Sequence, residues 1–105
     1  AAVVPVFKAW LEPFADLGAD RVTMERASGT DHLAFDRIGV PAFQFIQDGM
    51  DYMGRTHHSN VDSYDHLDPE DLKQSAVIIA AVIWHAANHD ELLPRKPLPT
   101  APESD

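Results

Sequence analysis

The stretch DPEDLKQSAVIIAAVIWHAANH, residues 68–89, predicts the most definite element of the chain, a long helix. Asp68 is a good N-cap, Pro69 suits the first helical position, and Asp71 would stand near the positive end of the helix dipole. Residues 77–84 are apolar almost all the way round a helix, and such a helix is buried on most sides. The fold should therefore be built around this helix.

The chain before residue 68 predicts two shorter helices and two strands. Residues 4–17 carry apolar side chains at three- and four-residue spacing, which predicts a helix kinked or split at Pro13. Residues 31–38 could form a short helix whose apolar side chains face inward. Residues 21–26 alternate like a half-buried strand, and residues 41–46 are mostly apolar, like a strand buried on both faces.

These elements are too few to close a domain. Two strands do not form a stable sheet alone, and an apolar helix needs more neighbours than two short helices provide. We therefore expect a segment of a larger α/β domain, or a chain that pairs with another chain and self-associates when isolated. Residues 1–93 would form this segment, and the Pro-rich residues 94–105 a tail.

Composition excludes several classes of function. The chain has 105 residues, of which 45% are hydrophobic, which predicts one small globular unit. Its formal net charge of −9 would repel nucleic-acid phosphates and an anionic membrane surface, so we expect neither as a partner. The sequence contains no cysteine, which excludes disulfides, thiolate nucleophiles and cysteine-ligated zinc.

The stretch THHSNVDSYDHL, residues 56–67, is the densest in possible metal ligands. His57, His58 and Asp62 could supply nitrogen and oxygen ligands, because imidazole is the commonest transition-metal ligand. Their spacing is loose, however, and a zinc site needs three or four ligands. The competing interpretation is a polar loop whose histidines cap or bridge neighbours and whose Asp62 is a turn residue. Spacing alone favours this second interpretation.

Other polar residues have structural interpretations. His66 lies just before the helix cap and is interpreted as a surface residue. His85 and His89 stand four residues apart near a helix C-terminus, where the dipole favours a cation. The turn GTDH, residues 29–32, could cap a short helix through Thr30 or Asp31, or form the wall of a pocket, and alone the cap is favoured.

Three motifs in order resemble a known family. They are GTDHLAF at residues 29–35, GVP at 39–41 and HSNVDS at 58–63, followed by the Pro-started helix. This arrangement resembles the C-terminal part of a di-zinc exopeptidase of metallopeptidase family twenty-eight. That family holds bacterial aminopeptidases, carboxypeptidase Q and, as a relative, glutaminyl cyclase. The resemblance runs from Val4 to about Pro97 and rests on the order and spacing of the motifs.

The resemblance implies a fold and a set of residue roles. The whole domain would be a three-layer α/β/α sandwich with a mixed sheet, of which only the C-terminal strands and helices are present. His58 would be the last zinc ligand, and His57 would take a catalytic position where some relatives have a tyrosine that donates to the tetrahedral intermediate. Asp62 would orient the loop that carries His58. Three residues of the first motif would line the site or contact substrate: Thr30, Asp31 and His32.

The resemblance also implies metal-assisted hydrolysis of a peptide bond at a chain end. Two zinc ions hold a bridging water in the family, and a glutamate takes its proton. The Glu-Glu pair and the H-x-D motif that lie upstream in the family are missing here, so we expect the isolated chain to be inactive and to need the rest of the catalytic domain. Secretion or export to the periplasm is implied by the resemblance alone.

Several alternatives stay open from sequence. The chain could be a non-catalytic interaction module with a peptidase-like fold, or it could belong to an enzyme of the glutaminyl cyclase type. Aminopeptidase, carboxypeptidase and dipeptidase specificity cannot be distinguished, because most pocket residues would lie outside this chain.

Overall fold

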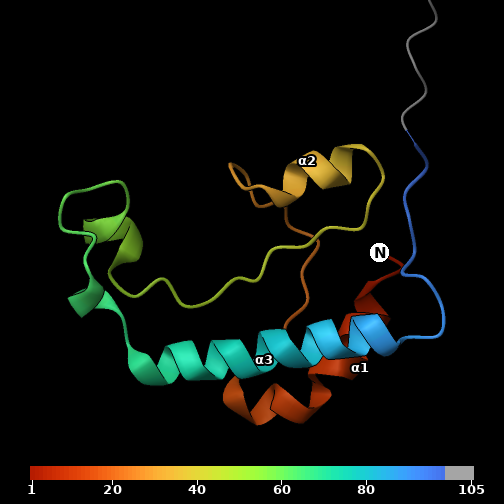
Figure 1. The fold of residues 1–105 in the computed structure, drawn as a ribbon, viewed down its shortest axis with the longest axis horizontal. Helices are drawn as coiled ribbons and strands as arrows, with labels where there is room; N and C mark the ends of the chain where they lie inside the picture. Colours follow the sequence, from red (N-terminus) through yellow and green to blue (C-terminus); the bar gives the residue numbers. More distant parts are fainter. Residues whose placement is uncertain (99–105) are drawn as a thin grey trace, which may run out of the picture.

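The computed structural model describes residues 1–98 as helical segments joined by long irregular stretches (Figure 1). The six segments follow in chain order: α1 (Val4–Leu11), the 3-10 helix η1 (Glu12–Leu17), α2 (His32–Arg37), the π-helical turn η2 (Tyr52–Thr56), the 3-10 helix η3 (Tyr64–His66) and α3 (Pro69–Asn88). No helix in the described part of the chain is long and apolar enough to cross a membrane.

The first helix begins and is interrupted where the sequence predicts. Pro5 lies in its first turn, where a missing N–H costs nothing. Pro13 cannot donate an α-helical hydrogen bond, so α1 ends at Leu11 and the chain continues as η1. Gly18 ends η1 with a φ of +82°, a left-handed conformation that glycine adopts without steric strain.

The start of α3 is fixed by its N-cap. The Asp68 Oδ1 accepts hydrogen bonds from the backbone N–H groups of Glu70 at 2.8 Å and Asp71 at 3.1 Å. These bonds satisfy two of the donors that every helix leaves unpaired at its first turn. The predicted cap is therefore confirmed, and α3 ends at Asn88, one residue before the predicted end.

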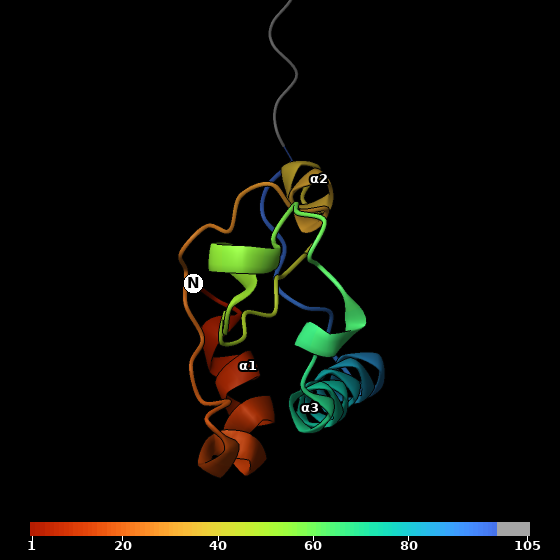
Figure 2. The same ribbon diagram turned by 90° about the vertical axis from the view of Figure 1, so that its left-hand side faces the viewer.

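The core lies where α1 packs against α3. It consists of four buried side chains: Trp10, Leu11, Ile78 and Val82. Figures 1 and 2 show the two helices side by side, with α2 away from them in both views. The Trp10 ring stacks on His85, at a centroid distance of 5.8 Å and an interplanar angle of 10°, and meets the edge of His89 at 5.6 Å. Both histidines thus pack against the core, in agreement with their structural interpretation.

The predicted strands are wrong. Residues 1–98 contain no strand, and residues 21–26 and 41–46 run as irregular chain without a backbone hydrogen bond between them. The α/β/α sandwich with a mixed sheet is therefore absent from the described chain. The physical reason is that a strand is stabilised by its hydrogen-bonded neighbours, and two short runs cannot supply a sheet. The run expected to be buried on both faces is largely exposed, with Ile46 at 73%.

Many apolar side chains have no cover. Phe35 and Ile38, predicted to face inward from the short helix, are 56% and 59% exposed. On α3, Ile83 and Trp84 are 61% and 62% exposed. The predicted shortage of neighbours for α3 is confirmed.

The C-terminal segment passes close to α2. The Lys96 ammonium donates to the Asp36 carboxylate, and this hydrogen bond holds the pKa of Asp36 below its ordinary value. A Cβ placed on Gly39 would lie 3.2 Å from the Lys96 carbonyl oxygen, so glycine permits this approach. The separate tail at 94–105 stays a prediction, and residues 99–105 lie outside the described chain.

Two isoleucines on α3 test the position of the core. Ile78→Ala should lower the free energy of unfolding of the chain by about 2–3 kcal/mol, the lower part of the usual range because the core is thin. Ile83→Ala is the matched control, because the same side chain is 61% exposed there, and it should change stability by less than about 0.5 kcal/mol. Urea unfolding of both variants measures the difference. Equal losses would contradict the α1–α3 core described here.

Candidate functional site

The histidine loop, residues 51–66, begins with a single π-helical turn. The backbone N–H of Arg55 donates to the Asp51 carbonyl at 2.9 Å, and that of His57 donates to the Tyr52 carbonyl at 2.8 Å. π-Helical turns are rare and often occur at functional sites. This turn brings Tyr52 and His57 to the same side of the loop, with ring centroids 5.0 Å apart.

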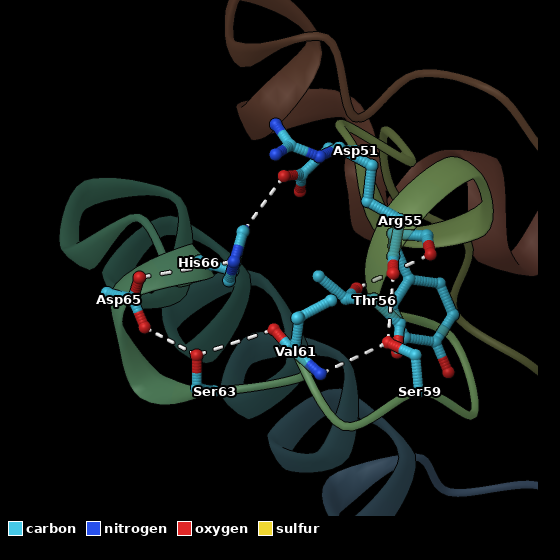
Figure 3. Close-up of polar contacts among 9 residues, drawn as sticks. Asp51, Arg55, Thr56, Ser59, Val61, Ser63, Asp65 and His66 are labelled. Carbon is cyan, nitrogen blue, oxygen red and sulfur yellow. Dashed lines mark hydrogen bonds and ion pairs between the residues drawn. The ribbon is translucent and has the colours of Figure 1, made fainter.

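Local hydrogen bonds make the loop compact. Thr56 is 2% exposed, and its hydroxyl donates to the Tyr52 carbonyl at 3.4 Å. The Ser59 hydroxyl lies 2.9 Å from the carbonyl oxygens of both Arg55 and Thr56 (Figure 3). The single proton of the Ser59 hydroxyl can be donated to one of these carbonyl oxygens at a time, and the Ser59 backbone N–H also donates to the Thr56 carbonyl at 3.0 Å.

His57 and His58 lie together on this turn. Their ring centroids are 3.9 Å apart, and His57 is half-buried while His58 is exposed. The His57 Nδ1 lies 2.9 Å from the Tyr52 hydroxyl. If the hydroxyl donates, His57 carries its proton on Nε2 and offers an N–H donor outward. If Nδ1–H donates, Nε2 offers a lone pair instead.

His58 adopts a left-handed backbone conformation with a φ of +53°. For a residue with a Cβ this conformation costs about 1–2 kcal/mol, because the Cβ approaches the following carbonyl oxygen. Such strain persists only where surrounding bonds impose it, and it is found preferentially at functional sites. Here the hydrogen bonds from the Ser59 N–H and hydroxyl to the Thr56 carbonyl span His58 and hold this conformation.

The two ends of the histidine loop are joined by a hydrogen bond between His66 and Asp51. The His66 Nδ1 lies 2.8 Å from the Asp51 Oδ2 (Figure 3). The His66 Nε2 faces Asp65 at 4.0 Å, and the Ser63 hydroxyl donates to Asp65. That hydroxyl lowers the pKa of the Asp65 carboxyl below its ordinary value. The interpretation of His66 as a surface residue is wrong, since its side chain is 23% exposed and bonded across the loop.

The first motif forms a separate feature at the start of α2. The Thr30 hydroxyl and the His32 Nδ1 are 2.5 Å apart. Asp31 holds the N-cap position, yet its side chain makes no capping hydrogen bond. An open hollow of about 330 Å³ lies against this turn. Its lining includes Thr30, Asp31 and Arg37.

The structure does not bring the two motifs together. Figure 1 shows α2 and the histidine loop apart along the long axis of the molecule. Within the loop, the Asp62 backbone N–H donates weakly to the Ser59 carbonyl at 3.4 Å. The predicted roles of Thr30, Asp31, His32, Asp62, His57 and His58 stay predictions.

The comparison with known families decides the membership. The sequence profile of peptidase family M28 matches residues 2–83. The chain belongs to peptidase family M28. The match spans α1, α2, the histidine loop and most of α3, and it confirms the family indicated by the three motifs. Comparison with curated proteins and with solved structures gave no match. Membership supports a hydrolase of the metallopeptidase kind that acts on peptides.

The described M28 residues do not make a metal site by themselves. Within residues 1–98, no three of the histidine, aspartate and glutamate side chains lie close enough to hold one ion. Zinc needs at least three protein ligands in a catalytic site. The neighbouring imidazoles of His57 and His58 suit zinc chemically, but they are at most part of a ligand set.

Sequence reasoning missed two residues of this M28 loop. Neither Asp51 nor Tyr52 was singled out from the sequence, yet their side chains contact His66 and His57. Tyr52 could have been noticed as an aromatic residue one π-turn before His57. Nothing in the sequence links Asp51 to His66, because the contact depends on how the loop closes over fifteen residues.

The two adjacent histidines should respond oppositely to glycine. His58→Gly removes left-handed strain and should leave the free energy of unfolding unchanged or raise it by up to about 1 kcal/mol. His57→Gly, at an ordinary φ of −55°, should lower it by about 1–2 kcal/mol, because backbone freedom rises and the Tyr52 contact is lost. Denaturant unfolding compares the two variants. An equal loss of unfolding free energy in both would contradict the strained geometry at His58.

Proposed function

We propose that this chain supplies the histidine loop of an M28 exopeptidase, which uses zinc to hydrolyse the peptide bond at a chain end. The observation that carries the proposal is His58, because a strained histidine stands at the ligand position of the family motif, inside the matched residues. The remaining ligands and the general base would come from residues outside this chain.

In this proposal the two histidines have different tasks. His58 is exposed and can offer a ring nitrogen to a metal ion held jointly with other residues. His57 is held by the Tyr52 hydroxyl, and when that hydroxyl donates, the Nε2–H of His57 is free to donate to a developing oxyanion. Zinc, when bound, would lower the pKa of water so that hydroxide forms near neutral pH.

The turn before α2 would contribute to the substrate pocket. Thr30 orients His32 through their short hydrogen bond, and Asp31 lines the adjoining hollow. A carboxylate at this place can accept a hydrogen bond from a substrate amine or amide. Asp62 would hold the loop in place once the rest of the domain is present. Whether the terminal residue released is at the N- or C-terminus depends on residues outside this chain, and export stays a prediction from the resemblance.

One observation favours a second candidate, a non-catalytic interaction module of the M28 family. The described residues lack a complete ligand set and leave much apolar surface exposed. A chain that only binds a partner needs no metal, whereas its apolar side chains would be covered in the complex. The two candidates differ in whether the natural protein retains zinc.

Peptide hydrolysis by the natural protein tests the first proposal. It should release single terminal residues from short peptides in a zinc-dependent reaction. His58→Ala should lower the rate at least about 100-fold, because mutating even a residue that hydrogen-bonds a metal ligand lowers metal affinity or activity about 10–100-fold. His89→Ala is the matched control, because His89 packs on Trp10 outside the loop. Release of single residues followed by chromatography gives the rates.

The isolated 105-residue chain should be inactive in the same assay, because its described residues cannot complete a zinc site. Zinc-dependent release by this chain alone would show that the ligand set is complete here. A natural protein that binds no zinc and releases nothing would favour the interaction module. Cyclisation of an N-terminal glutamine in place of hydrolysis would favour the cyclase alternative.

A further inference from the structure

We propose that Asp51 and His66 form a clasp that positions the histidine loop for the M28 reaction. This inference rests on the proposed function and adds two positioning residues to it. Neither residue belongs to the motifs that indicate the family, and neither would touch substrate. They would influence the reaction through Tyr52, which follows Asp51 in the chain and contacts His57.

The clasp joins the two stems of the loop. Asp51 is the residue immediately before the π-turn, and His66 is the last residue of η3, two residues before the N-cap of α3. Their 2.8 Å contact spans fifteen residues and brings the beginning of the loop against η3, just before α3 in the chain (Figure 3). The position of the π-turn is thereby tied to a rigid element, as a precise site requires.

The other side-chain hydrogen bonds of the loop act within it. Those described between residues 52 and 65 connect partners at most five positions apart, such as Tyr52 with His57 and Ser59 with Arg55. Such bonds fix the shape of the turn and leave its orientation on the molecule free. Only the Asp51–His66 bond among the described side-chain bonds of the loop closes it end to end.

The chemistry of the clasp suits a positioning role. An imidazole Nδ1–H donating to a carboxylate is directional, and a protonated histidine would add charge to the bond. His66 faces two carboxylates, Asp51 at 2.8 Å and Asp65 at 4.0 Å, and Asp65 is itself held by the Ser63 hydroxyl. The side chains of His66 and Asp51 are partly shielded from solvent, with exposed fractions of 23% and 35%. A partly shielded, directional bond fixes a loop better than an exposed one.

A chain of contacts runs from the clasp to the proposed catalytic donor. Asp51 accepts from His66, and the next residue, Tyr52, contacts the His57 Nδ1 at 2.9 Å. Loss of the clasp would therefore loosen the loop, so that the Tyr52–His57 pair drifts and the backbone hydrogen bonds of the turn open more often. A displacement of about 1 Å of a catalytic group can reduce a rate about 100-fold, mostly through kcat.

The molecule offers a matched control. The Ser75 hydroxyl lies 3.0 Å from the Gln47 Oε1, so a second side-chain bond also joins the segment before the loop to α3. It lies outside the loop, among exposed residues. If the clasp merely tethered the segment, removing either bond would have the same effect. If it positions the turn, only the Asp51–His66 bond matters to the loop.

Hydrogen exchange and steady-state kinetics on the natural protein test the clasp. His66→Phe keeps a ring but removes the donor, so it should raise exchange of the His57 and Ser59 amides about tenfold and lower kcat about 10–100-fold, with KM within about threefold. Asp51→Asn keeps an acceptor for the Nδ1–H and should retain most of the wild-type kcat. Ser75→Ala should change neither readout.

Two results would overturn the clasp. One is a His66→Phe variant whose amide exchange and kcat equal those of the wild-type protein. The other is a Ser75→Ala variant whose kcat falls as much as that of His66→Phe. If His66→Phe fails to fold by circular dichroism, Asp51→Ala removes the same bond from the other side and takes its place. A wild-type protein without peptidase activity would refute the proposed function, whereas the exchange of the loop amides would still decide whether the clasp holds the loop.

Discussion

The packing of α1 across α3 is the contact on which the rest of the structure depends. Trp10 and Leu11 meet Ile78 and Val82, and these are the only hydrophobic side chains among the described residues that are buried. The histidine loop ends at the N-terminus of α3, so its placement follows from that of the helix. In the sequence, the irregular stretches and α2 lie between the two packed helices, and Figure 1 shows them to one side of that pair.

Helix boundaries could be predicted because their signals are local. Pro13 interrupts a helix by its own geometry, Gly18 ends it by adopting a left-handed φ, and Asp68 caps α3 with its own carboxylate. The strands at 21–26 and 41–46 could not be predicted in this way, because alternation describes which side chains could be buried and not whether a partner strand exists. An alternating pattern forms a strand only where a neighbouring strand is present to hydrogen-bond with it.

For the candidate site, too, the sequence predicts the local features but not those that depend on distant contacts. The family membership was readable from the order of the motifs, since GTDHLAF and HSNVDS lie within the matched residues. The π-turn, the positive φ of His58 and the Asp51–His66 contact were not readable, because each arises from the closure of the loop as a whole. A motif therefore identified a histidine, whereas only the structure gave the bonds that hold it.

The α1–α3 core also has a consequence for biosynthesis. Its two halves, around Trp10 and Val82, stand about seventy residues apart in the chain. During translation, α1 and everything between must leave the ribosome before the second half of the core is available. The side chains of Trp10 and Leu11 would stay exposed for that time, because their partners on α3 are not yet made, and long-range contacts form slowly. The nascent chain is therefore a natural client for chaperones until α3 is complete.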